Sequence, residues 1–389
     1  MPRRLVVGCM TGTSLDALDV ALVGIDGTGW SLRAEWLAGV SQPLGPLSGP
    51  LRALASQVPQ SAGTIARLVH DFSQLHVRTI RELTARRTVD LVAAHGQTVF
   101  HAPPVSWQLL NPAPIAHALQ VPVVCDLRAA DLAAGGQGAP ITPAADYLLF
   151  ADEREPRAVV NLGGFCNITC LPARRRRDAG SPDDLAAVRA LDVCACNHLL
   201  DGLARRLLSQ PYDEDGRCAG AGQVVPTLRD ELLGGLRAQA AGGRSLGTGD
   251  ELDAVVRRAA SAGSAADVLR SACEALATVI AETVRAATAR DQLAPPERYL
   301  LAGGGTRNRV LVAALTAHAQ VPVEPTQAHG IPAAYREAAA LAVLGALCQD
   351  GVPITLPAVT AVESPAPLSG VWVYSTRERA AANREAVRP

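Results

Sequence analysis

Three glycine-containing turns in this chain each follow an apolar run and carry hydroxyl or amide side chains, a combination suited to holding phosphate. Glycine lets backbone N–H groups approach an anion closely, and short polar side chains add further donors. The second turn contains Gly163 and Gly164 between Asn161 and Asn167, and the third is Gly303, Gly304 and Gly305 followed by Asn308. The first turn comprises Gly12, Thr13, Ser14, Leu15, Asp16, Ala17, Leu18 and Asp19.

Any one of these turns would also suit an ordinary hairpin or the entry to a helix. Their recurrence after three separate apolar runs favours a shared role, and we predict that all three bind a nucleotide. In the first turn two carboxylates would repel phosphate unless a divalent cation lies between them, so Asp16 is predicted to hold Mg²⁺ through water. The third turn precedes a predicted helix, whose N-terminal N–H groups and dipole favour an anion.

The chain contains no lysine, so all 36 of its basic residues are arginine. A Walker P-loop places a lysine on the β- and γ-phosphates, protein kinases use a strand lysine, and Schiff-base enzymes need an amine. The sequence therefore excludes these mechanisms. Phosphoryl chemistry in this chain must rest on glycine turns, carboxylates and Mg²⁺.

The overall charge points to a small-molecule partner. The 36 basic and 37 acidic residues nearly cancel, so no net field favours nucleic acid or a membrane surface. No apolar run approaches the ~20 residues needed to cross a bilayer, and no signal peptide is evident near Met1. The nine cysteines are odd in number and suit reduced thiols, so we expect a cytoplasmic protein.

The elements that must position these turns alternate between strands and helices, as in an α/β protein. Apolar residues recur at helical spacing over 61–87 and 265–289, and strands are predicted over 90–94, 299–302 and 370–375. The strand–turn–strand pattern at the N-terminus returns near Ala158, which indicates an internal duplication. We expect a first domain over 1–150, joined by the C-terminal segment 353–389, and a second domain over 151–352.

Six segments in order, GCMTGTSLDALDVAL, AHGQTVFH, VVCDLRAADLAAGGQGAPI, VVNLGGFCNIT, DEDGRCAGAGQV and LLAGGGTRN, resemble the motifs of the anhydro-N-acetylmuramic acid kinase family. The resemblance implies an actin/hexokinase-like (ASKHA) fold, with two RNase H-like domains around a central nucleotide and sugar cleft. It also implies ATP, Mg²⁺ and a homodimer. The implied reaction transfers phosphate from ATP to O6 of 1,6-anhydro-N-acetylmuramic acid while water opens the anhydro bridge, giving N-acetylmuramic acid 6-phosphate in cell-wall recycling.

The resemblance assigns roles to further residues. It aligns the family's general base with Asp192, which ends the apolar stretch AVRALD and is expected to be a buried carboxylate at a strand end. A loop-capping role for Asp192 stays open. Glu337 joins Asp16 as a Mg²⁺ residue, and sugar contacts are carried over to His95, Gln97, Thr98, Arg128 and Asp131, with Arg128 suited to the lactyl carboxylate.

The chain departs from the family pattern at the base, where DVCACN stands in place of the usual DTGPGN. Three alternatives follow. The substrate could be another anhydro sugar such as levoglucosan, or the protein could be a catalytically silent nucleotide-binding relative. A zinc site from Cys166, Cys170, Cys194, Cys196 and His198 is a weaker hypothesis, because the CxC and CxxxC spacings differ from those of structural zinc sites.

Overall fold

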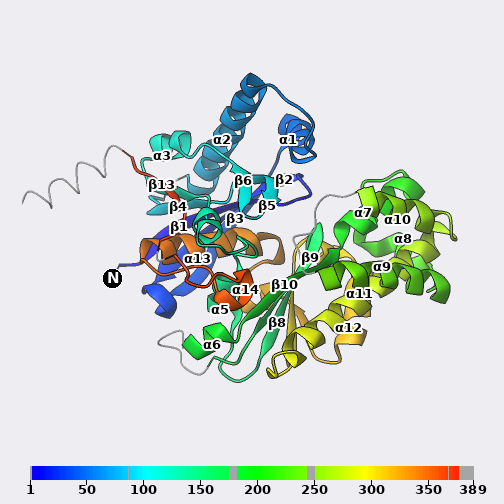
Figure 1. Ribbon diagram of the computed structural model, residues 1–389. Helices are drawn as coiled ribbons and strands as arrows, with labels where there is room; N and C mark the ends of the chain where they lie inside the picture. The colour runs from blue at the N-terminus through cyan, green and yellow to red at the C-terminus, as the bar shows by residue number, and fades with distance from the viewer. Residues whose placement is uncertain (1, 86, 175–181, 243–249, 367, 376–389) are drawn as a thin grey trace, which may run out of the picture. The chain divides into compact units, whose positions relative to one another are not determined.

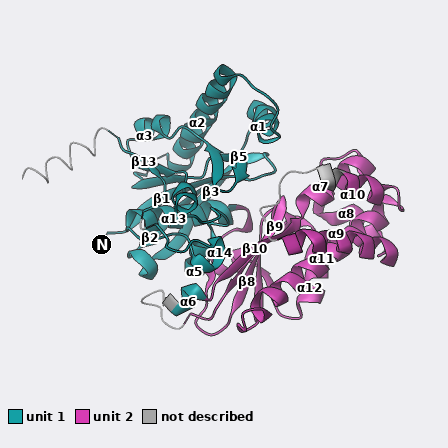
Figure 2. Ribbon diagram, viewed as in Figure 1, with its two compact units in different colours: residues 1–149, 176–186, 335–389 teal, residues 150–175, 187–334 magenta. Residues whose placement is uncertain are grey.

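The computed structural model describes residues 2–85, 87–174, 182–242, 250–366 and 368–375 (Figure 1). The chain divides into two compact units, coloured separately in Figure 2. Unit 1 comprises residues 1–149, 176–186 and 335–389, and unit 2 comprises residues 150–175 and 187–334. In the described part of the chain no helix is long and apolar enough to cross a membrane.

This division differs from the expected boundaries at helix α13 (Arg336–Gln349), which we had assigned to the second domain. The helix belongs to unit 1 because it packs directly on β1 (Arg4–Thr11): a Cβ at Gly8 would lie 1.9 Å from the carbonyl oxygen of Ala338. Helix α6 (Pro182–Ala186) also belongs to unit 1. Of the C-terminal segment assigned to the first domain, residues 376–389 lie outside the described residues.

Unit 1 is built on a six-stranded sheet with the order β13-β7-β4-β1-β2-β3. β1, β2 and β3 are antiparallel neighbours, β4 and β7 continue parallel to β1, and β13 is antiparallel to β7. A separate hairpin, β5–β6, follows β4. The strand bounds are β2 Ala17–Asp26, β3 Arg33–Pro43, β4 Leu91–Ala94, β5 Gln97–Ala102, β6 Val105–Leu109, β7 Val123–Cys125 and β13 Val371–Val373.

Two helices cover opposite faces of this sheet. Side chains alternate along a strand, so Val7 and Cys9 point into the core shared with α2 (Ala62–Thr84), whereas Gly8 meets α13. The α2 helix matches the predicted periodicity and is capped by Ser61, whose side chain accepts the N–H of Thr64. The remaining helices of this part of the fold are α1 Ser48–Ala55, α3 Ala113–Leu119, α4 Ala129–Ala133, α5 Pro143–Phe150 and α14 Pro357–Thr360.

Unit 2 repeats the same design with five strands in the order β10-β9-β8-β11-β12. β8 (Arg157–Leu162), β9 (Phe165–Leu171) and β10 (Arg189–Ala195) are antiparallel neighbours, and β11 (Arg298–Ala302) and β12 (Val323–Pro325) run parallel to β8. In both units the first three strands form an antiparallel meander and the next two lie parallel to the first. This is the RNase H-like strand order, and its repetition confirms the predicted duplicated actin/hexokinase-like fold.

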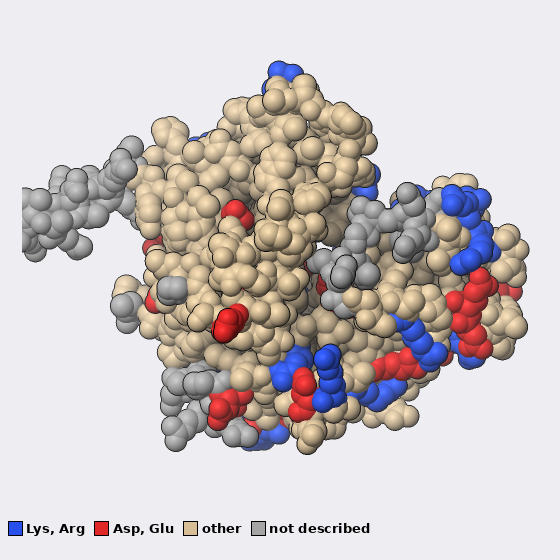
Figure 3. Space-filling view, viewed as in Figure 1, with Lys and Arg blue, Asp and Glu red and all other residues tan. Residues whose placement is uncertain are grey.

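The core of unit 2 lies between its sheet and a helical layer centred on α11 (Ala265–Ala289), which has the bounds predicted from its periodicity. Ser264 caps this helix by accepting the N–H of Asp267. The other helices are α7 Asn197–Leu208, α8 Arg217–Ala221, α9 Pro226–Gly242, α10 Asp250–Ala260 and α12 Arg309–Ala319. Figure 3 shows acidic and basic side chains interspersed over these helices. Arg237 of α9 and Glu282 of α11 form an ion pair.

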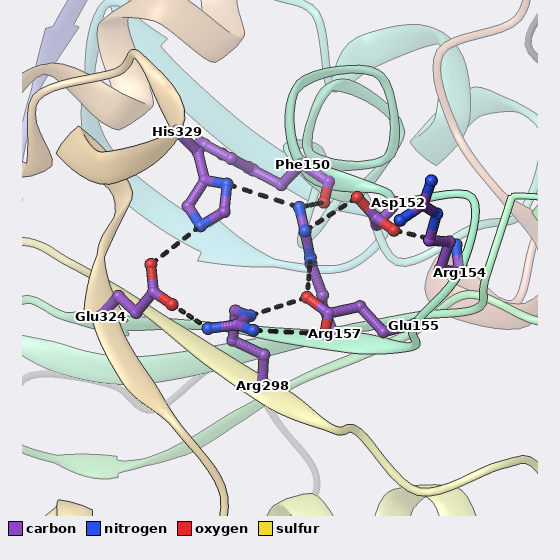
Figure 4. Close-up of polar contacts among 8 residues, drawn as sticks. All are labelled: Phe150, Asp152, Arg154, Glu155, Arg157, Arg298, Glu324 and His329. Carbon is purple, nitrogen blue, oxygen red and sulfur yellow. Dashed lines mark hydrogen bonds and ion pairs between the residues drawn. The ribbon is translucent and has the colours of Figure 1, made fainter.

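An ion-pair network joins the N-terminal ends of β8 and β11 (Figure 4). Glu155 accepts from the Nε atoms of Arg157, at 2.9 Å, and Arg298, at 2.7 Å. Arg298 also pairs with Glu324, whose other carboxylate oxygen lies 3.4 Å from His329 Nε2. The glycine turns of unit 2 follow the opposite, C-terminal ends of the same strands, so this network stabilises the sheet at a distance from those turns.

Candidate functional site

Three of the predicted site residues of unit 2 form a row across its sheet. Asn161 on β8 pairs in register with Asn167 on β9, and Asn167 pairs with Asp192 on β10. Directly opposed residues in an antiparallel pair have Cβ atoms about 5 Å apart and share one face of the sheet. Asn161 is buried, whereas Asn167 and Asp192 are half-buried. The row therefore places a carboxylate beside two amides at a partly accessible face.

The structure corrects the expected setting of Asp192. It is half-buried and is the fourth of the seven residues of β10, so it is neither fully buried nor at the strand end. The register of β10 on β9 shifts between Asp192 and Cys194, which marks a β-bulge. A bulge bends a strand and changes the direction of its side chains, and such irregularities are frequent beside active sites.

The second glycine turn is tied to the N-terminus of α7. The carbonyl of Gly163 accepts the N–H of Asn197 at 3.0 Å, and the carbonyl of Gly164 accepts the N–H groups of Cys196 and His198 at 2.9 and 3.1 Å. These N–H groups belong to the first turn of the helix, where no intrahelical acceptor exists. The turn therefore caps α7, and its carbonyl groups point to the helix.

The third glycine turn packs on the end of β8. A Cβ at Gly303 would lie 2.7 Å from the Leu162 carbonyl oxygen, and one at Gly305 would lie 2.7 Å from Leu162 Cβ. Gly303 also has a φ of +83°, which disfavours any side chain. Gly304 is different: it is exposed, and the nearest atom to an added Cβ is Asn197 Nδ2, at 3.8 Å. Two glycines thus serve packing, and the central one leaves open space for a ligand.

Asn308, also predicted to contact the nucleotide, caps α12. Its Oδ1 accepts the N–H groups of Val310 and Leu311 at 3.1 and 3.0 Å. This bond satisfies two of the unpaired donors at the helix start. The Asn308 side chain therefore holds the end of the third turn, and the short helix η4 (Gly304–Arg307) separates it from the first of the three glycines.

In unit 1 the first glycine turn is closed by a hydrogen bond from Leu15 N to Gly12 O at 3.1 Å. Leu15 has a φ of 58°, and its side chain is buried together with that of Leu18. These two residues can therefore offer only backbone atoms to a ligand. Thr13 and Asp16 are exposed, and Gly12, Ser14, Ala17 and Asp19 are half-buried.

A segment from another part of unit 1 supports this turn. Ser48 Oγ donates to the Leu15 carbonyl at 2.7 Å, and a guanidinium nitrogen of Arg52 donates to the Ser14 carbonyl at 2.6 Å. The Thr11 hydroxyl is buried just before the turn and has no hydrogen-bond partner among the described residues. The turn is thus held through its carbonyl groups, which leaves its exposed side chains for a ligand.

The two carboxylates predicted to hold Mg²⁺ both lie in unit 1. Asp16 is exposed at the start of β2, and Glu337 lies in the first turn of α13. The contact between Gly8 and Ala338 lays that first turn against the C-terminal half of β1, from which the glycine turn leads. Within the described ranges, no three His, Cys, Asp or Glu side chains converge as direct metal ligands.

The predicted sugar residues of unit 1 include a hydrogen-bonded pair, His95 and Arg128. Arg128 Nε donates to His95 Nε2 at 2.9 Å, and its NH1 donates to the Gly138 carbonyl at 3.0 Å. Burial, together with the nearby Arg128 charge, lowers the pKa of His95 to about 3. His95 is therefore neutral, with its Nδ1 proton donated to the Gly96 carbonyl, and it orients the Arg128 guanidinium.

Asp131 organises the loop that follows α4. Its buried carboxylate accepts the N–H of Gly138 at 2.7 Å and the hydroxyl of Thr360 at 2.8 Å.

Gln97 and Thr98 begin strand β5. The side-chain oxygen of Gln97 is buried and has no hydrogen-bond partner among the described residues. It can accept a hydrogen bond from a ligand, whereas both carboxylate oxygens of Asp131 already serve the fold.

The family model for anhydro-N-acetylmuramic acid kinase matches residues 4–374. The chain belongs to this family. It is 36% identical over 397 residues to the anhydro-N-acetylmuramic acid kinase of Salinibacter ruber, covering 95% of this chain and 96% of that protein. It is 35% identical over 385 residues to the one from Bordetella pertussis, covering 96% and 97%. Among solved structures it is similar to a ROK family glucokinase from Streptomyces griseus, with a TM-score of 0.41, 14% identity and coverage of 88% and 99%.

The DVCACN departure from the kinase family's pattern replaces two glycines with cysteines. Cys194 and Cys196 do not have positive φ, so the backbone here does not require glycine, and both thiols lie in the apolar core. Burial raises the pKa of the Cys166, Cys194 and Cys196 thiols, which keeps them protonated. Buried and protonated, these cysteines fill the core as small apolar side chains.

Sequence reasoning did not identify several residues that support the kinase family's motifs here. Asn197, Ser48, Arg52 and Thr360 each hold a predicted site segment through hydrogen bonds. Ser48, Arg52 and Thr360 are far from their partners in the chain, and their local sequence carries no signal of these contacts. Asn197 could have been selected, because it is the one residue besides the aspartate that DVCACN retains from the family's motif.

Proposed function

We propose that this chain uses ATP to phosphorylate O6 of 1,6-anhydro-N-acetylmuramic acid while water opens the anhydro bridge, giving N-acetylmuramic acid 6-phosphate. The observation that carries the proposal is the row of Asp192, Asn167 and Asn161 beside two glycine turns, in a chain that matches the kinase family over residues 4–374. The row supplies a carboxylate base, and the turns supply backbone donors for phosphate.

In the proposed reaction the Asp192 carboxylate takes a proton from water as the water oxygen bonds to C1. The C1–O6 bond breaks, and its electron pair leaves with O6. O6 then forms the new bond to the γ-phosphorus of ATP as the bond from that phosphorus to the β,γ-bridging oxygen breaks, which releases ADP. The amide of Asn167, opposite Asp192, would hold the carboxylate in place.

The remaining predicted residues fit the two substrates. The exposed Gly304 lets a nucleotide approach the third turn, and the unpaired Gln97 oxygen can accept from a sugar hydroxyl. Arg128, oriented by His95, would pair with the lactyl carboxylate. Mg²⁺ would be held by Asp16 and Glu337 through water, and when bound it would neutralise charge on the phosphates, as one or two carboxylates commonly suffice for this ion.

The deciding experiment measures ATP consumption by the purified protein with 1,6-anhydro-N-acetylmuramic acid and Mg²⁺, and the mass of the product. We expect ADP and a product heavier than the sugar by one phosphoryl group and one water. Turnover with levoglucosan alone would assign the other anhydro-sugar kinase. Saturable ATP binding without turnover on either sugar would contradict the proposal and indicate a silent nucleotide-binding relative.

The proposal extends to a cytoplasmic homodimer, as expected of this kinase family. Light scattering of the purified chain should give twice the mass of the 389-residue monomer. A monomer at all concentrations tested would contradict the dimer without affecting the catalytic assignment.

A further inference from the structure

Asn197, the first residue of α7, contacts both glycine turns of unit 2. Its backbone N–H donates to the Gly163 carbonyl at 3.0 Å, and its Nδ2 donates to the Leu162 carbonyl at 3.0 Å. On its other side an added Cβ at Gly305 would lie 2.9 Å from its Oδ1. One side chain therefore fills the space between the second and third turns.

The Leu162 carbonyl is the point at which these segments meet. Leu162 is fully buried, and Gly303 and Gly305 both approach its carbonyl too closely for any side chain to intervene. A buried carbonyl needs a hydrogen-bond donor, and the Nδ2 group of Asn197 donates to this one, which ties the two turns together. The Cys196 thiol, a weak donor, also lies 3.9 Å from Oδ1.

We infer that Asn197 is a positioning residue for nucleotide binding: it holds the second and third glycine turns as one cradle for the phosphates. The inference rests on the proposed function and adds to it a residue whose side chain acts through the turns. Gly304 is the one exposed glycine of the third turn, and a Cβ added to it would lie 3.8 Å from Asn197 Nδ2. The amide thus lies directly beneath the surface that the nucleotide would approach.

The test compares Asn197→Ala with the parent chain and with Val279→Ala. Val279 is a buried residue of α11 in the core of unit 2, and none of the turn contacts described above involves it. Its truncation should therefore lower stability without altering the cradle. Affinity for the non-hydrolysable ATP analogue adenylyl imidodiphosphate with Mg²⁺ is measured by calorimetry at 25 °C. Melting temperatures of the three proteins without nucleotide are measured on the same preparations.

We expect Asn197→Ala to bind the analogue about three- to ten-fold more weakly, the range that loss of one hydrogen bond gives. Val279→Ala should bind like the parent even where its melting temperature is lower. In steady-state kinetics the KM for ATP should rise in Asn197→Ala, and the KM for the sugar should stay within two-fold, about the scatter of such measurements. Equal analogue affinity in Asn197→Ala and Val279→Ala would overturn the inference and leave Asn197 a structural residue.

If Asn197→Ala does not fold, Asn197→Ser takes its place in the same comparison, because serine retains a small hydroxyl at the helix start. The test also separates this inference from the proposed function. A parent chain that binds no analogue contradicts nucleotide binding altogether. A parent that binds and turns over, with an Asn197 variant of unchanged affinity, contradicts only the role of Asn197.

Discussion

Asp192 is the residue on which the proposed chemistry depends most. Asp192→Asn keeps the shape of the side chain but cannot accept the water proton, so turnover should fall by the ~10²- to 10⁴-fold typical of a general base. Nucleotide affinity and melting temperature should stay near those of the parent, because Asp192 is half-buried and the substitution keeps its size beside Asn167, its register partner on β9. Turnover within a few-fold of the parent, together with a lower melting temperature, would instead indicate a structural role.

Gly304 tests whether the third turn contacts nucleotide. Gly304→Val adds a side chain in open space, so we expect little change in melting temperature and about a ten-fold or greater loss of ATP affinity from blocked backbone approach. Gly235→Val, at an exposed position of α9 with no atom within 4 Å of the added Cβ, is the matched control. Gly303→Ala should behave differently and lower stability by more than ~1 kcal/mol, because its φ is +83°. An unaltered affinity in Gly304→Val would remove the third turn from the nucleotide site.

At the scale of elements, local sequence was sufficient where a helix has a clear apolar face and a cap. The amphipathic pattern and Ser264 define α11, and Ser61 similarly defines the start of α2. Local sequence was insufficient where the structure depends on packing between segments that are distant in the chain. The assignment of α13 to unit 1 depends on Gly8 meeting Ala338, and the strand β10 that carries Asp192 pairs with β9 through a bulge directly after that residue. Neither contact leaves a local pattern.

The ion-pair network at the N-terminal end of the second sheet should stabilise unit 2 rather than take part in catalysis. Glu155 accepts from two arginines, and the hydrogen bond from Arg298 is the main cause that lowers the Glu155 pKa. Glu155→Gln leaves two partly buried guanidinium groups without their shared carboxylate, so we expect a loss of roughly 1–3 kcal/mol in the free energy of unfolding. Urea unfolding measures it.

The control for this network is Glu231→Gln. Glu231 pairs with Arg258 at 3.5 Å, and both side chains are more than half exposed, so its loss should change stability by less than ~0.5 kcal/mol. Turnover should be unchanged in both variants once the protein is folded. Equal effects of the two substitutions on unfolding would contradict a special contribution from the network.

For the whole molecule, the buried histidines make stability fall as the pH drops below neutrality. Burial lowers the pKa of His76 to about 4, and burial with Arg128 lowers that of His95 to about 3. The unfolded chain, with a histidine pKa of ~6.5, binds protons in a range where the folded protein does not. The stability contributed by neutral burial is complete above pH ~6.5 and is lost as the pH falls toward the folded pKa values.

Each of these two histidines should lower the free energy of unfolding by about 1.4 kcal/mol per pH unit within that window, or by roughly 2 kcal/mol at pH 5. The lowered pKa values of His101 and His329 act in the same direction. Carboxylates with lowered pKa values, such as Glu155, lose their contribution only below pH ~4.5, so unfolding in urea at pH 7.5, 6.5 and 5.5 avoids their titration. His76→Gln removes one titrating group and should flatten the profile by about one proton's slope. A free energy of unfolding that stays constant over this range, or an unaltered slope in His76→Gln, would contradict the prediction. It would show that these histidines have similar pKa values in the folded and unfolded protein.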